Sequence, residues 1–157
     1  MDSISAGGHG GHSPSLNAMA VQATLHCLTG CAIGEVLGLV LSTTLGWHDL
    51  PSIVLATVLA FLFGYSFTFV PLMTSGMSFP SAARIALAGD TVSIVVMEIV
   101  DNAVVLAVPG AMSAGLTDAL FWGSLAAGLL LAFCAAYPVN AWMIRRGLGH
   151  ARGHAHH

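Results

Sequence analysis

The chain has 157 residues, of which 56% are hydrophobic and only 7% are charged. Soluble domains carry roughly 25% charged residues, so this composition excludes an ordinary soluble domain and indicates a protein of the lipid bilayer. The net charge of −3, with four basic residues in all, excludes a nucleic-acid-binding protein. Three cysteines in so apolar a chain are not typical of a disulfide scaffold.

The N-terminal half predicts a tail and two membrane spans. Residues 1–15 are rich in Gly and Ser and are expected to form a flexible tail that carries His9 and His12. A first span is predicted over about residues 17–45. A turn with an interfacial Trp47 follows, and Pro51 suits the first position of a second span over about residues 51–75. Both segments are long enough to cross a bilayer.

The C-terminal half predicts two further spans and a second tail. The third span is expected over about residues 84–108, opened by Arg84 and stopped by a Pro-Gly pair. The fourth is expected over about residues 118–144, with Asp118 as its N-cap. Residues 147–157 form a His-rich tail. The fold class is therefore an all-α integral membrane protein, a four-helix transmembrane bundle over residues 16–146.

The basic residues predict the orientation of this bundle. With four spans, the two tails and the loop between the second and third spans lie on one side. All the basic residues fall there: Arg84, Arg145, Arg146 and Arg152. By the positive-inside rule, both termini are expected in the cytoplasm of a bacterial cell, with the chain as a multi-pass protein of the inner (plasma) membrane.

Glycines spaced by four residues mark the first span. Gly30, Gly34 and Gly38 form a double small-xxx-small pattern, which allows another helix to approach closely in lipid. We expect this glycine-rich face to pack two copies of the chain together in a homo-oligomer.

The spans also carry side chains suited to bind a metal ion. The candidate ligands are Cys27, Cys31, His26, Glu35, Glu98, Asp101, Asp90, Cys134, Met73 and Met77. Counting the rise along each helix places Glu35, Glu98 and Asp101 to the outer side of the midplane, and the thiols, imidazole and thioethers inward. Sulfur and imidazole ligands favour soft metals, whereas carboxylates favour hard cations or protons. We therefore predict that the protein binds or transports a copper ion, Cu(I) first, between the first and third spans.

One geometric difficulty concerns His26 and Glu35. On an ideal helix they lie about 180° apart, so they do not line one narrow straight path. We expect one of them to act within a protomer and the other across an oligomer interface. Tyr137 and Asn140 on the fourth span are the expected hydrogen-bond partners of His26.

Other interpretations of the same residues remain open. The carboxylates would suffice for a cation or proton channel in which the thiols are structural. A third possibility is a non-transporting membrane subunit or assembly factor of a metalloenzyme. The acids would also serve as polar contacts between helices, and a buried Cys is often a small apolar side chain. The sequence has no nucleophile–base pair, so we expect no enzyme activity.

Two stretches carry a resemblance to a known family. LHCLTGCAIGEVLG (25–38) and GDTVSIVVMEIVDN (89–102) resemble a bacterial family of four-span membrane proteins classified as a domain of unknown function, DUF4396. The likeness covers nearly all of residues 22–144 and implies the fold and the key positions, but no activity. A looser analogy links the chain to Ctr-type copper transporters, which also combine His/Met tails, a membrane M-x-x-x-M and a glycine zipper. Here the M-x-x-x-M is Met73/Met77, and there are four spans rather than three.

Overall fold

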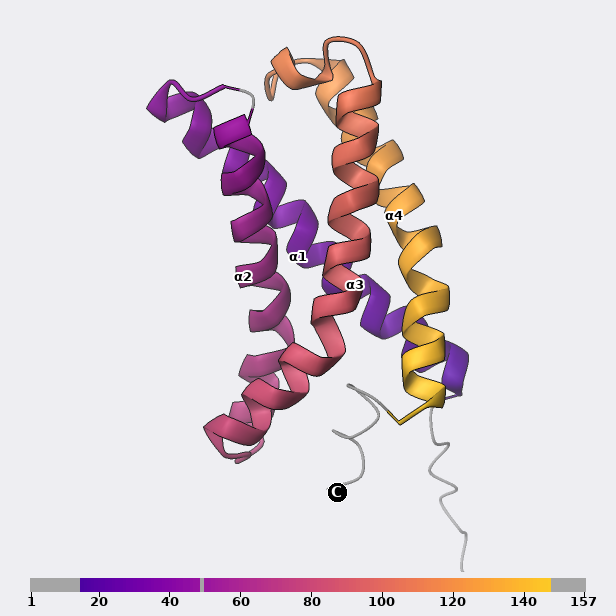
Figure 1. The fold of residues 1–157 in the computed structure, drawn as a ribbon. Coiled ribbons are helices and arrows are strands. Elements are labelled where there is room, and N and C mark those ends of the chain that lie inside the picture. Colours follow the sequence, from indigo (N-terminus) through magenta and orange to yellow (C-terminus); the bar gives the residue numbers. More distant parts are fainter. Residues whose placement is uncertain (1–14, 49, 148–157) are drawn as a thin grey trace, which may run out of the picture.

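The structure is a computed structural model that describes residues 15–48 and 50–147, and it is all-α over these ranges (Figure 1). Its helices are α1 (Leu16–Leu45), α2 (Leu50–Thr74), α3 (Phe79–Ala107), the short 3₁₀-helix η1 (Ala111–Ser113) and α4 (Ala119–Arg145). Both predicted tails, with their histidines, lie outside the described residues except for Ser15 and Gly147.

Local capping explains where the helices begin and end. Ser15 accepts a hydrogen bond from the Ala18 amide at 3.2 Å and so caps α1, which ends at Gly46 in the left-handed conformation (φ 67°). The third helix begins at Phe79, five residues before the expected Arg84, because Pro80 fits its first turn. Asp118 occupies the N-cap position of α4, but its carboxylate accepts from the Gly115 amide at 2.8 Å and not from the helix.

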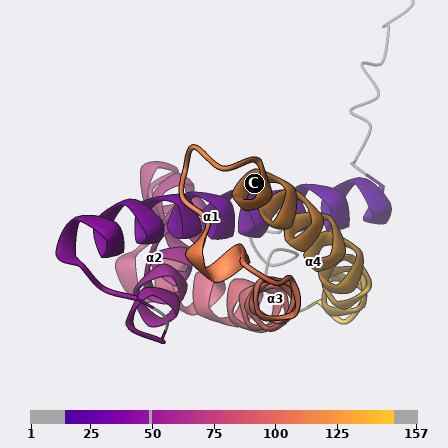
Figure 2. The ribbon, with the colours of Figure 1, turned by 90° about the horizontal axis from the view of Figure 1, so that it is seen from above.

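The helix α1 crosses the other three and holds them together. In Figure 1 it passes diagonally behind α2, α3 and α4, and Figure 2 shows it lying along one side of the bundle. It contacts all three helices, most extensively α2, while α3 packs between α2 and α4. A side chain on the inner face of α1 is therefore brought next to α3.

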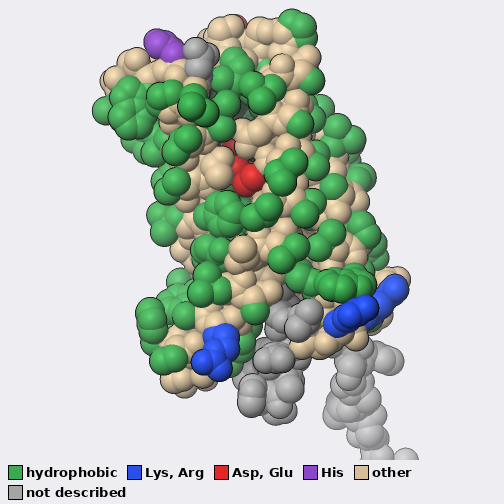
Figure 3. Space-filling view, viewed as in Figure 1, with side chains coloured by type: hydrophobic (Ala, Val, Ile, Leu, Met, Phe, Trp, Pro, Cys, Tyr) green, Lys and Arg blue, Asp and Glu red, His purple; other side chains and the backbone are tan. Residues whose placement is uncertain are grey.

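The surface is apolar between the two ends of the bundle. In the part of the chain that the structure describes, three helices are long and apolar enough to cross a membrane: α1, α2 and α4. The 29-residue α3 carries three acids, Asp90, Glu98 and Asp101, and the neighbouring helices bury all of them. On the face shown in Figure 3, basic side chains gather at the end formed by the α2–α3 turn and the end of α4. Acidic atoms lie in a hollow midway along the same face.

The glycine face of α1 packs against α2 of the same chain. A Cβ on Gly30 would lie 2.6 Å from the Gly64 backbone, and one on Gly38 would lie 2.6 Å from Ala56 Cα. A Cβ on Gly34 would overlap the backbone of Ala60. The expectation that this face joins two copies of the chain therefore needs correction, because α2 already covers it.

This contact predicts opposite effects for two glycine substitutions. Gly34→Ala should lower stability by about 1–3 kcal/mol, because the new methyl group forces α1 away from Ala60. Gly123→Ala on α4 is the matched control, since nothing lies within 4 Å of its added Cβ. It should instead stabilise by about 0.5–1 kcal/mol through helix propensity. Thermal unfolding in detergent measures both, and equal effects would contradict the packing described here.

Candidate functional site

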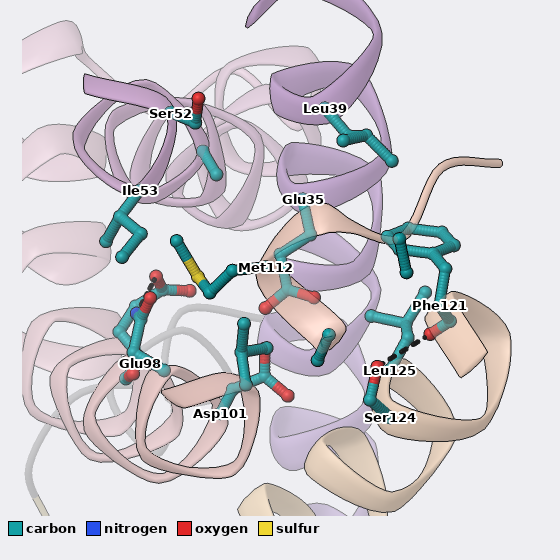
Figure 4. A pocket seen from close by; sticks show the side chains of 15 residues that line it. Glu35, Leu39, Ser52, Ile53, Glu98, Asp101, Met112, Phe121, Ser124 and Leu125 are labelled. Carbon is teal, nitrogen blue, oxygen red and sulfur yellow. Dashed lines mark hydrogen bonds between the residues drawn. The ribbon is translucent and has the colours of Figure 1, made fainter. Parts of the chain in front are cut away.

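Three acids from two helices line one cavity of about 100 Å³ (Figure 4). Glu35 extends from α1, and Glu98 and Asp101 extend from α3. The remaining wall comes from all four α-helices and from η1 with the residue after it, and is mostly apolar, with Ser52, Asn102 and Ser124 as polar members. Figure 4 shows the Glu35 and Asp101 carboxylates facing the same space, with Met112 beside Glu98. The cavity has room for a few water molecules.

Cys31, Thr57 and Asn102 interact with the Glu98 carboxyl group, but two carboxyl oxygens of this cavity have no hydrogen-bond partner among the described residues. Glu98 is 5% exposed, and its Oε2 is 3.5 Å from Asn102 Nδ2. The other oxygen, Oε1, has no hydrogen-bond partner among the described residues, and the same holds for Asp101 Oδ1. None of the lining residues is basic. An unpaired buried carboxylate is costly, so these groups require a proton, water or a cation.

A glycine on α4 makes the space for Asp101. A Cβ on Gly128 would overlap the Asp101 carboxylate. The position therefore has no room for a side chain while Asp101 keeps its place. Gly128 belongs to the buried side of α4, which places this acid at the contact between α3 and α4.

Both thiols of α1 lie beside the acids of α3. Cys27 and Cys31 are each 1% exposed. The Cys31 thiol interacts with the Glu98 carboxyl group, and the Cys27 thiol donates to Asp90 Oδ1 at 3.7 Å. Glu35 lies one helical turn beyond Cys31. Cys27, Cys31 and Glu35 therefore share one side of α1, and this side faces α3.

The buried side chains of Cys31, Cys27, Asp90, Ser93, Thr24 and Asn140 form a polar column beneath the cavity. At its inner end, a buried amide connects three helices. Asn140 Nδ2 of α4 donates to Thr24 Oγ1 of α1 at 2.9 Å and to Ser93 Oγ of α3 at 3.0 Å. Thr24 and Ser93 were not among the residues predicted from the sequence. Their spacing was a usable signal, since Thr24 lies three residues before Cys27, and Ser93 lies three residues after Asp90.

The comparison with known families identifies the chain. The model of the family described as Domain of unknown function (DUF4396) matches residues 16–149. The chain belongs to this family. Among curated proteins and solved structures, none matches it. In this DUF4396 protein, the family match covers every residue of the acid-lined cavity and of the polar column beneath it.

Several predicted ligands of the DUF4396 chain lie away from the cavity. Cys134 is exposed on α4. Met73 is 37% exposed near the end of α2, and Met77 follows in the turn, so the two methionines do not share one helix. Over residues 15–48 and 50–147, no three His, Cys, Asp or Glu side chains are close enough together to hold a metal ion.

The expected partners of His26 are also different. Its imidazole stacks on Phe67 of α2, with ring centroids 6.5 Å apart, and the Asn140 amide donates to Thr24 and Ser93 instead. The ring of Tyr137 stacks on Phe133. Because α2 packs beside this part of α1, His26 and Glu35 point to different surroundings within one chain.

The contact between Gly128 and Asp101 gives a prediction about stability. Gly128→Ala should destabilise the DUF4396 protein by about 1–3 kcal/mol, because its methyl group displaces the carboxylate. Adding Asp101→Ala should recover most of this loss by removing the overlapping atoms. A double-mutant cycle of thermal unfolding in detergent measures the coupling. Strictly additive effects would show that the two residues do not meet.

Proposed function

We propose that this protein conducts protons across a membrane, with Glu35, Glu98 and Asp101 as a proton-binding group. The observation that carries the proposal is the pair of buried, unpartnered oxygens, Glu98 Oε1 and Asp101 Oδ1, in a cavity without a basic residue. Acids inside membrane bundles typically mark proton or ion pathways. A proton neutralises each carboxylate where it lies, without a basic partner.

The shape of the site favours protons over a tightly bound metal ion. A dehydrated metal ion needs several ligands converging within bonding distance, and the described residues offer no such group of His, Cys, Asp and Glu. The acids instead surround an open space of about 100 Å³. Water molecules in such a space pass protons from one carboxyl group to the next.

We propose a four-span insertion in the bacterial inner membrane, with both termini in the cytoplasm. Three apolar helices support it, as does the burial of the α3 acids inside the bundle. The described arginines, Arg84, Arg145 and Arg146, lie at the end formed by the α2–α3 turn and the end of α4. The cavity lies toward the other end, under η1, which makes it the outer entrance of the path.

This orientation predicts the behaviour of a reporter that is active only outside the cytoplasm. A fusion after His157 should be silent, and an insertion between Pro109 and Asp118 should be active. An insertion in the α2–α3 turn at Gly76 should also be silent and serves as the control. Reversed signals would place the cavity on the cytoplasmic side.

Other functions compatible with the sequence need different observations. Cu(I) binding at the thiols stays a prediction, and Cys134 and Met73 are exposed whereas the thiols of Cys27 and Cys31 are buried. A non-transporting subunit of a metalloenzyme would need a partner surface. Near-integer copper in protein purified under reducing conditions would favour the copper function over proton conduction.

Proton flux into proteoliposomes tests the proposal directly. The unmodified protein should collapse an imposed pH gradient, measured with an internal pH-sensitive dye and potassium–valinomycin to balance charge. Glu98→Gln combined with Asp101→Asn should slow the flux by about an order of magnitude, because neutral amides do not bind and release protons. Asp118→Asn is the control, since this exposed acid binds the Gly115 amide outside the cavity. Equal flux in all three proteins would contradict the assignment.

A further inference from the structure

Hydrogen bonds from three helices gather around a second buried acid, outside the cavity. Asp90, on α3, is completely buried. The Cys27 thiol donates to its Oδ1 at 3.7 Å, and Ser93 interacts with the same thiol. Asn140 Nδ2 in turn donates to Ser93 at 3.0 Å. The cluster thus joins α1, α3 and α4 around one carboxyl group.

We infer that Asp90 is an inner proton-binding site, linked to the outer cavity through the thiols of Cys31 and Cys27. This inference rests on the proposed function and extends it along the bundle. Cys31 interacts with Glu98 of the cavity, Cys27 donates to Asp90, and the two thiols lie one helical turn apart. They bridge two acids that are eight residues apart on α3.

The direction of the hydrogen bonds supports this role. The Thr24 hydroxyl donates to the Ala20 carbonyl at 2.7 Å, so its oxygen acts as an acceptor toward Asn140. This fixes the amide with Nδ2 toward Thr24 and Ser93. The oxygen Asn140 Oδ1 is buried in the same cluster, on a residue 1% exposed, without a hydrogen-bond partner among the described residues. Asn140 therefore adds an unused acceptor to the cluster that contains Ser93 and Cys27.

Within the described part of the chain, titratable and polar side chains lie around Asp90 on all four helices. From α1 it meets the Cys27 thiol, and from α4 the neutral Asn140 reaches it through Ser93. The hydroxyl of Tyr65 on α2 is engaged with Thr91 at 2.8 Å. Arg84, on α3 like Asp90, is exposed, and His26 of α1 stacks on Phe67. Among these side chains, the Cys27 thiol is the ionisable group that donates a hydrogen bond to Asp90.

The transfer step moves one proton and leaves both thiols unchanged. The Cys27 S–H bond breaks as its proton passes to the Asp90 carboxylate. The Cys27 sulfur takes a proton from Cys31, and Cys31 is reprotonated by the Glu98 carboxyl group. The net change is a carboxylate at Glu98 and a carboxylic acid at Asp90.

Substitutions at Cys27 test the relay in proteoliposomes. Cys27→Ser should keep proton flux within about twofold of the unmodified protein, because a hydroxyl both donates and accepts hydrogen bonds. Cys27→Ala should slow the flux by about an order of magnitude, since a methyl group does neither. Cys134→Ala, on the exposed face of α4, is the matched control and should leave the flux unchanged. Unaltered flux in Cys27→Ala, or equal loss in the Ser and Ala variants when both unfold at the same temperature, would overturn the relay.

A second measurement reports on Asp90 itself. Infrared difference spectra of the purified protein after a pH jump should contain a carboxylic-acid band that Asp90→Asn removes, and an S–H band that Cys27→Ser removes. An acid with only a structural role would give no such titrating band, and its absence would overturn the inference. If flux depends on Glu98 and Asp101 but not on Asp90, the relay is wrong and the proposed function stands. A protein that conducts no protons at all would end both.

Discussion

The close contact between α1 and α2 is the constraint on which the rest of the bundle depends. Gly30 meets the backbone of Gly64, Gly34 that of Ala60, and Gly38 that of Ala56. The two helices therefore approach without intervening side chains. This contact fixes the rotation of α1 about its axis. Cys27, Cys31 and Glu35 occupy the side adjacent to the glycine face, so the same rotation turns them toward α3. A wider α1–α2 spacing would move Cys27, Cys31 and Glu35 out of alignment with the acids of α3.

The acids of α3 impose the second constraint. A helix with Asp90, Glu98 and Asp101 is costly to expose to lipid, so the other helices must cover it on the sides where these residues lie. α1 covers it with small side chains, and α4 approaches closely at Gly128, where Asp101 fills the place of a side chain. The bundle can thus hold three acids in an apolar interior, but it provides them with few donors. That shortage leaves Glu98 Oε1 and Asp101 Oδ1 without a hydrogen-bond partner among the described residues.

Much of this architecture was accessible from the sequence because it depends on local signals. Apolar length, Pro and Gly placed the four helices, and the rise per residue predicted that Glu35, Glu98 and Asp101 would share one level. The rotation of α4 was harder to predict. Its buried side repeats every four residues, at Gly128, Ala132, Ala136 and Asn140. This stripe of small residues places Cys134 on the opposite, exposed side. A glycine pattern likewise indicates close approach but does not say whether the partner helix belongs to the same chain.

The use of cysteine at positions 27 and 31 follows from the conflicting demands of this interior. Both positions lie in a cluster with Ile94, Met97 and small alanines, where a strongly polar side chain would cost free energy whenever its hydrogen bond opened. A thiol packs as a small apolar group and still carries an S–H that donates to a carboxylate. It therefore maintains the core when the bond is broken and connects to Asp90 or Glu98 when it is made. Few other side chains can both pack in an apolar core and hydrogen-bond to a buried carboxyl group.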